Sequence, residues 1–130
     1  MSKLRAAVIG AGYFGRLHAV KLAANPDVEL VAVADLDAAR SESVARETGC
    51  RPVRDFRELI GNIDIASVAV PTESHHALAR PLIEAGVHVL VEKPIAKTLE
   101  QADDLVGLAA ARSTVLAVGH QERFNPAFMA

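Results

Sequence analysis

The residues of this sequence that are best suited to ligand chemistry form a glycine-rich turn close to the N-terminus. A short apolar run leads into Gly10, Gly12 and Gly15, which have the spacing Gly-x-Gly-x-x-Gly, and a helical pattern follows them. In such a turn the first glycine permits a tight bend, the second leaves room for a pyrophosphate, and the third allows close helix packing. Asp35 ends a second apolar run, where a carboxylate can bind ribose hydroxyls. The pattern predicts a bound dinucleotide.

The acid at position 35 also indicates which dinucleotide would bind. A carboxylate there repels the 2′-phosphate that distinguishes NADP from NAD, so the sequence favours NAD over NADP. Arg40 follows closely and could turn toward the same corner, where its positive charge would weaken the discrimination. The structural alternative is a glycine turn with an incidental acid at a strand end.

A second candidate for chemistry is Lys93, in the tripeptide Glu92-Lys93-Pro94 directly after an apolar run. A lysine at a strand end can exchange a proton with a substrate hydroxyl that becomes a carbonyl. That role needs a neutral amine, which partial burial or a nearby positive charge such as oxidised nicotinamide favours. The structural alternative is a surface lysine that pairs with Glu92.

A third predicted strand end carries Pro71, Thr72 and His75. We expect this segment to line the nicotinamide side of a cleft, with His75 in contact with the nicotinamide ring or the substrate. Thr72 or Ser74 is also suited to cap the helix that follows. His76 is turned about 100° further round that helix and is expected at the surface.

A polar stretch follows the final predicted strand. Within it His120, Arg123 and Asn125 are candidate substrate contacts. Arg123 could bind a phosphate or a carboxylate, or it could pair locally with Glu122.

The other histidines and the single cysteine suggest no further chemistry. His18 and His88 are expected to have packing roles, because one lies in the predicted first helix and the other inside a predicted strand. Together with Cys50 the histidines show no metal-ligand spacing, so no metal is predicted. The sequence also has no Gly-x-Ser-x-Gly turn, which argues against a serine hydrolase.

The elements that must position these residues alternate between short β-rich runs and longer helical stretches. The expected strands are 4–9, 29–34, 64–70, 87–91 and 115–118, and the expected helices are 13–24, 37–48, 74–85 and 98–111, with a short strand at 51–53 and a helical turn at 55–60. This order predicts an α/β Rossmann fold with a doubly wound, mostly parallel sheet. We expect one dinucleotide-binding domain over 1–120 and the start of a linker over 121–130. Ligands of such sheets bind beyond the carboxyl ends of the strands, which the candidate residues follow.

The composition agrees with this fold and argues against two classes of partner, nucleic acids and membranes. The chain has 130 residues, of which 51% are hydrophobic, and a formal net charge of −2, which gives no reason to expect nucleic acid as a partner. No apolar run approaches the roughly 18 residues of a membrane helix, so no membrane partner is expected. A single cysteine fits a reducing compartment, and a cytoplasmic location is predicted.

Four ordered motifs together resemble the Gfo/Idh/MocA oxidoreductase family, over residues 4–126. Gly10-Ala11-Gly12-Tyr13-Phe14-Gly15 with His18 is similar to its cofactor turn, Asp35 to its ribose-binding acid, Pro71-Thr72 with His75 to its nicotinamide-side loop, and Glu92-Lys93-Pro94 to its signature tripeptide. The resemblance implies that these residues, Tyr13, Phe14 and Pro94 included, contact the cofactor. It also implies that Lys93, assisted by Glu92, moves a proton while hydride passes between the nicotinamide and a hydroxyl of a sugar, nucleotide sugar or polyol.

The resemblance further implies a second domain that this chain does not contain. Members of the family carry a substrate-binding α/β domain after the cofactor domain, and they form homo-oligomers when complete. We therefore expect this chain to bind NAD without turning over a substrate by itself. The alternative from a different class is a non-enzymatic NAD(H)-binding sensor or regulatory module, because a Rossmann motif alone does not fix function.

Overall fold

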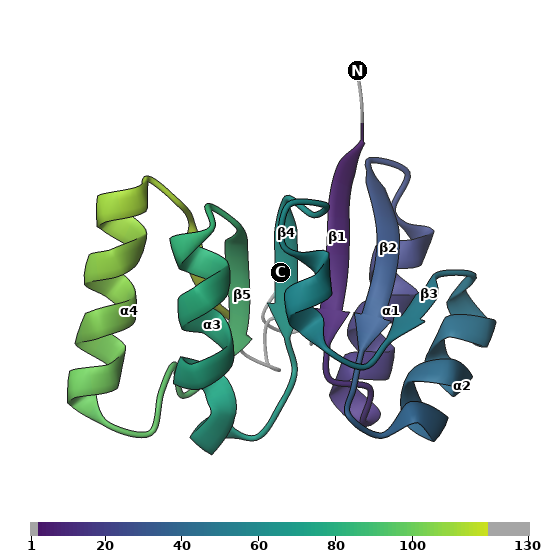
Figure 1. Cartoon of the computed structure of the whole chain (residues 1–130), viewed down its shortest axis with the longest axis horizontal. Helices are drawn as coiled ribbons and strands as arrows, with labels where there is room; N and C mark the ends of the chain where they lie inside the picture. The colour runs from purple at the N-terminus through teal and green to yellow at the C-terminus, as the bar shows by residue number, and fades with distance from the viewer. Residues whose placement is uncertain (1–2, 120–130) are drawn as a thin grey trace, which may run out of the picture.

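A parallel sheet forms the centre of the computed structural model of this chain, which describes residues 3–119. Within that range the strands are β1 (Leu4–Ile9), β2 (Val28–Ala34), β3 (Arg51–Val53), β4 (Ile65–Val68), β5 (His88–Glu92) and β6 (Leu116–Gly119). They pair in the order β3-β2-β1-β4-β5-β6, and every neighbouring pair is parallel (Figure 1). The predicted α/β Rossmann fold is confirmed. The bounds of β1 and β3 match the predicted ones, and the ends of the other strands differ by at most two residues.

Helices connect successive strands. They are α1 (Tyr13–Ala24), α2 (Ala38–Thr48), α3 (His75–Glu84) and α4 (Leu99–Arg112), with the short 3₁₀ helices η1 (Phe56–Leu59) and η2 (Thr72–Ser74). The first helix has the predicted bounds, and η1 corresponds to the predicted turn at 55–60. The third predicted helix, 74–85, corresponds to α3, and η2 directly precedes it.

The two faces of the sheet bury separate cores because successive strand residues point to opposite sides. In β1, Ala7 and Ile9 belong to the larger core, which lies under α3, α4 and η1, whereas Val8 belongs to the smaller core under α1 and α2. Leu82 of α3 and Leu105 of α4 are fully buried in the larger core. The helices therefore cover the sheet from both sides.

One part of the sheet has an open face among residues 3–119. Beside α1, the β4–β6 half carries a groove of about 310 Å³. Apolar side chains make up most of its wall, including Leu22, Ile65, Leu90, Val115 and Ala117. The residues of β5 and β6 that face this groove are consequently only partly buried.

The helix N-termini differ in how their free N–H groups are satisfied. Asp37 caps α2 by accepting from the Ala39 N–H at 3.0 Å, and Thr98 caps α4 by accepting from the Gln101 N–H at 3.1 Å. The prediction that Thr72 or Ser74 caps α3 is wrong, because Ser74 is the N-cap residue but no side chain caps the helix, and the His75 N–H donates to the Thr72 carbonyl instead.

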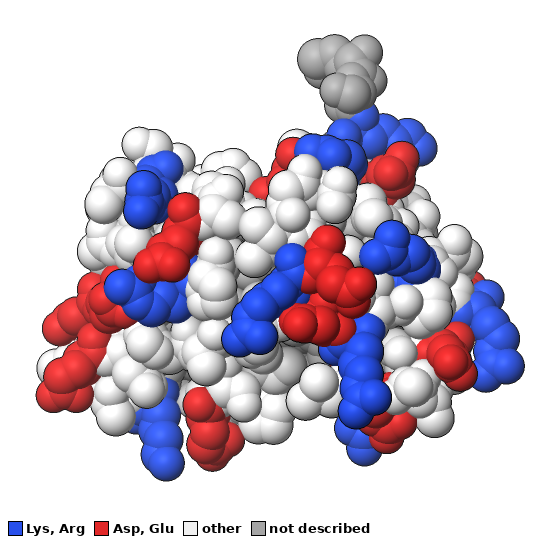
Figure 2. All heavy atoms as spheres, in the orientation of Figure 1, with Lys and Arg blue, Asp and Glu red and all other residues white. Residues whose placement is uncertain are grey.

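Charges are mixed over the surface. On the face in Figure 2, Lys and Arg side chains are interspersed with Asp and Glu side chains. Arg16 of α1 and Glu47 of α2 form a two-bond pair at 2.6 and 2.8 Å, and the hydrogen bonding from Arg16 lowers the pKa of the Glu47 carboxyl. In the part of the chain that the structure describes, no helix is long and apolar enough to cross a membrane.

The turn between β1 and α1 depends on two glycines that touch. Gly10 has a φ of +105°, which side chains rarely tolerate, and its N–H donates to the Ala34 carbonyl at 2.7 Å. A Cβ on Gly15 would lie 1.8 Å from the Gly10 carbonyl oxygen, whereas a Cβ on Gly12 would meet nothing within 4 Å. Gly15 is therefore required by the fold itself, and Gly12 is not.

This contrast predicts opposite effects of two alanine substitutions on stability. Gly15→Ala should lower the free energy of unfolding by about 3 kcal/mol or more, because its Cβ would overlap a backbone atom that cannot turn aside. Gly12→Ala, the matched control, should cost no more than about 1 kcal/mol. Thermal or denaturant unfolding followed by circular dichroism measures both, and equal losses would contradict this account of the turn.

Candidate functional site

An open cleft of about 1340 Å³ lies along the edge of the sheet where the strands end. In Figure 1 the arrowheads of β1, β2 and β4 point to this edge. Segments that follow β1 to β5, together with Gly119 of β6, form its wall. Sites for drug-sized ligands usually measure about 300 to 1,000 Å³, so this cleft has room for a longer molecule such as a dinucleotide.

Most of the predicted cofactor residues lie in this cleft. Its wall contains Gly10, Gly12, Tyr13, Phe14, Asp35, Pro71, Thr72, His75, Glu92 and Lys93. Gly15 is buried behind the turn, and Pro94 is not part of the wall. The candidate substrate residues His120, Arg123 and Asn125 lie outside the described residues.

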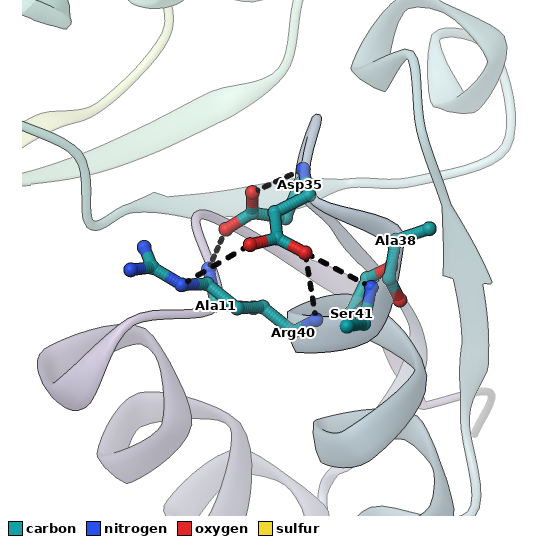
Figure 3. A network of polar contacts seen from close by, with 7 residues as sticks. Ala11, Asp35, Ala38, Arg40 and Ser41 are labelled. Carbon is teal, nitrogen blue, oxygen red and sulfur yellow. Dashed lines mark hydrogen bonds and ion pairs between the residues drawn. The ribbon is translucent and has the colours of Figure 1, made fainter.

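Backbone N–H groups fix the Asp35 carboxylate from two sides. One oxygen accepts from the Ala11 N–H in the glycine turn and the other from the Asp37 N–H, each at 2.8 Å (Figure 3). Each carboxylate oxygen can accept further hydrogen bonds. Asp35 thus joins the ends of β1 and β2 and keeps acceptor capacity at the cleft wall, while Asp37 caps the helix.

Arg40 is held beside this corner. Its Nε lies 3.6 Å from an Asp37 carboxylate oxygen, and the side chain also lines the cleft. In Figure 3 a dashed line joins the Arg40 guanidinium to a carboxylate oxygen. The positive charge that the sequence suggested for this corner is therefore present, but an acidic neighbour partly offsets it.

Several lining residues beyond β3 were missed by the sequence interpretation. Arg54, Arg57 and the Phe56 ring line the cleft, and the Arg57 guanidinium carbon lies 5.5 Å from the centre of that ring. The exposed Leu36 belongs to the same end of the cleft. The signal was available, since these arginines follow a predicted strand end in the same way as Asp35 does.

Lys93 follows the last residue of β5 and is exposed at the cleft wall. Its N–H donates to the Gly119 carbonyl at 3.0 Å, and the Lys93–Pro94 peptide is cis. Within residues 3–119 Lys93 makes no ion pair. The alternative in which Lys93 pairs with Glu92 is therefore wrong, because Glu92 is engaged elsewhere.

His18 is the partner of Glu92. Its Nε2 lies 3.0 Å from a Glu92 carboxylate oxygen, and its Nδ1 lies 2.5 Å from the Ser67 hydroxyl. The ring therefore spans α1, β4 and β5. This agrees with a packing role for His18, although its partners were not predictable from spacing.

His75 is placed differently from the expectation of a free ring in the cleft. It is 1% exposed, and both ring nitrogens lie 3.0 Å from backbone carbonyl oxygens, Nδ1 from Pro94 and Nε2 from Val70. Neither nitrogen is left for a ligand, although part of the ring borders the cleft. His75 therefore connects two loops of the site.

The two remaining described histidines lie away from these contacts. His76 is 2.7 Å from the Asp104 carboxylate on α4, and His88 accepts from the Val115 N–H at 3.0 Å. Among the residues that the structure describes, no cluster of His, Cys, Asp or Glu could hold a metal ion.

The cleft also offers an anion site at the N-terminus of α1. Gly12 is the N-cap residue, no side chain caps the helix, and no acidic residue lies in its first turn. Free N–H groups at a helix start attract anionic groups such as a pyrophosphate. The glycine turn therefore fits the phosphates of a dinucleotide, with Asp35 on one side of them.

Comparison with known proteins gives the same picture. Residues 4–120 match the family model described as "Oxidoreductase family, NAD-binding Rossmann fold". The UDP-N-acetylglucosamine 3-dehydrogenase of Acidithiobacillus ferrooxidans is 42% identical over 127 residues, which are 98% of this chain and 40% of that protein. A solved structure of it gives a TM-score of 0.91 and covers 99% of this chain and 42% of that one.

Two further relatives differ in what their names describe. Inositol 2-dehydrogenase of Rhizobium meliloti is 36% identical over 129 residues, 98% of this chain and 39% of that protein. The structure of GenD2 from gentamicin A biosynthesis, solved in complex with NAD, gives a TM-score of 0.88 at 35% identity and covers 92% of this chain and 35% of that one.

The chain thus spans about 40% of the length of the curated relatives that it matches. The family match, by contrast, extends over nearly the whole of this chain. The chain belongs to the Gfo/Idh/MocA oxidoreductase family, and the match corresponds to the NAD-binding Rossmann domain of that family.

Proposed function

We propose that this chain binds NAD(H) in the cleft and supplies the cofactor half of a dehydrogenase. The observation that carries the proposal is the Asp35 carboxylate, which two backbone N–H groups hold beside the glycine turn. The adenosine ribose then binds at Asp35, the pyrophosphate lies over the N-terminus of α1, and the nicotinamide extends toward Thr72 and Lys93 at the far end of the same cleft.

The preference between the two dinucleotides follows from charge at the ribose corner. Asp35 offers acceptors to two ribose hydroxyls and repels a 2′-phosphate. Arg40 lines the same cleft as a compensating cation, and it is paired with Asp37. We therefore propose NAD as the preferred cofactor and NADP as the weaker one.

Lys93 is the proposed proton-transfer residue. When bound, oxidised NAD accepts a hydride from the carbon that carries the substrate hydroxyl. The Lys93 amine, in its neutral form, takes the proton of that hydroxyl as the carbonyl forms, and it returns the proton in the reverse direction. An exposed lysine in the cleft wall without an ion pair in residues 3–119 supports an enzyme rather than a sensor, because a sensor has no need of a proton acceptor there.

The proposed substrates are sugars, nucleotide sugars and polyols. The names of the relatives support this class, since one is a UDP-N-acetylglucosamine 3-dehydrogenase and another an inositol 2-dehydrogenase. His120, Arg123 and Asn125 stay predicted substrate contacts. We further propose that the complete protein is a cytoplasmic homo-oligomer, and that residues 1–130 alone bind NAD without turnover.

The first test addresses the adenosine end. Asp35→Ala should weaken NADH binding by about tenfold to a hundredfold, since a hydrogen bond to a charged group is worth about 1.5 to 3 kcal/mol. The loss should be smaller for NADPH, which the carboxylate repels. Asp103→Ala on the exposed side of α4 is the matched control. Nicotinamide fluorescence or calorimetry gives the dissociation constants, and an unchanged NADH affinity would remove Asp35 from the site.

The second test addresses Lys93 in the complete protein. Lys93→Met should lower kcat by about a hundredfold to ten-thousandfold, the usual contribution of a proton-transfer residue, while the NAD dissociation constant changes little. Lys97→Met, four residues along and exposed, is the control. NADH formation is assayed with UDP-N-acetylglucosamine and with myo-inositol. Equal turnover of the Lys93 variant and the wild type would exclude this role.

A further inference from the structure

We propose that His18 and His75 are positioning residues that together hold Lys93 in the cleft. The inference rests on the proposed role of Lys93 and deepens it. Neither ring contacts Lys93 itself. Each holds one of its two chain neighbours, Glu92 on one side and Pro94 on the other.

His18 fixes the residue before the lysine. The His18 Nε2 lies 3.0 Å from a Glu92 carboxylate oxygen, and a proton on this nitrogen faces the negative charge of the carboxylate. The Nδ1 lies 2.5 Å from the Ser67 hydroxyl, which can donate or accept a hydrogen bond, and this contact sets the orientation of the ring. The His18 and Glu92 side chains are only 10% and 20% exposed, so water screens this contact weakly. Glu92 is thereby turned toward α1 and away from pairing with Lys93.

His75 fixes the residue after the lysine. Its nitrogens face the Pro94 and Val70 carbonyl oxygens, which are both acceptors only. A neutral imidazole donates to one of them at a time, and a protonated ring donates to both. In either state the buried ring spans the loop after β4, which leads to Pro71 and Thr72, and the loop after β5. The two walls of the proposed nicotinamide end are therefore spaced by this one side chain.

The lysine itself is held by its backbone. With the Lys93 N–H on the Gly119 carbonyl, three consecutive residues are each held at one point by a different element: α1, β6 and α3. Only the side chain of Lys93 remains to be ordered. A proton-transfer group must lie within hydrogen-bond reach of the reacting hydroxyl, and small misplacements cost much of the rate. The two histidines provide that placement from outside the reaction.

The test observes the lysine directly and needs no substrate. The sequence has four lysines, Lys3, Lys21, Lys93 and Lys97, and reductive ¹³C-methylation gives each an NMR signal. Lys93→Arg assigns the signal of interest. In the wild type we expect NAD⁺ to shift the Lys93 signal and to leave that of Lys97 in place.

His18→Phe and His75→Phe remove the ring nitrogens and keep a ring of similar size. In each variant the response of the Lys93 signal to NAD⁺ should fall by roughly half or more, because the amine is no longer confined. The NADH dissociation constant should stay within about threefold of the wild type, since the adenosine end is untouched. His76→Phe, adjacent to His75 but bound to Asp104, is the matched control and should behave as the wild type.

A milder variant keeps the proposal testable if a phenylalanine variant does not fold. Ser67→Ala removes only the hydroxyl that orients His18 and should give a response between those of the wild type and His18→Phe. Ser41→Ala, another buried serine, is its control and should have no effect. His18→Gln, whose amide can still donate to Glu92, should restore much of the response.

The outcomes separate this inference from the proposed function. Folded variants of both histidines with a wild-type Lys93 response would overturn the positioning role and leave the role of Lys93 intact. A wild-type protein that binds NAD⁺ with no response at Lys93 would overturn the proposed function, and the positioning role with it.

Discussion

The common direction of the six described strands is the constraint on which the candidate site depends. Because every neighbouring pair is parallel, all six described strands end at the same edge, and each of β1 to β5 is followed there by its next segment. Residues separated by more than a hundred positions, such as Gly10 and Gly119, therefore line one cleft. No single strand or helix of the described residues contains the whole candidate site. The described strands form the site by ending at one edge, and β1 and β2 bury side chains in the cores on both faces of the sheet.

Within this frame the two ends of the cleft are ordered in different ways. Backbone groups order the glycine turn, since N–H groups hold Asp35 and two glycines allow α1 to begin close to β1. Side chains order the Lys93 end, because histidines from α1 and α3 contact the end of β5 and the loop that follows it. The hydrogen bonds to Asp35 come from turns that directly follow β1 and β2. The histidine contacts depend on packing between segments that are distant in the sequence.

That difference explains how much could be predicted from the sequence. The helix over 13–24, the glycine turn, Asp35 and the tripeptide at Lys93 were accessible, since each rests on local spacing. The partners of His18 and His75 could not be predicted, because they depend on how the helices pack against the sheet. The arginines after β3 were accessible in principle, but a three-residue strand gives a weak pattern.

The way Asp35 is held links the orientation of its carboxylate to the folding of two turns. Its two N–H donors belong to the turns after β1 and β2, so the carboxylate keeps its orientation only while those turns are folded. Folding therefore already bears the entropic cost of ordering the carboxylate, which would otherwise oppose the binding of a ligand. By thermodynamic linkage, a ligand bound to the ordered carboxylate stabilises these two turns in return. Local opening of these two turns would release the carboxylate from its orientation, and such opening can occur well below the temperature of global unfolding.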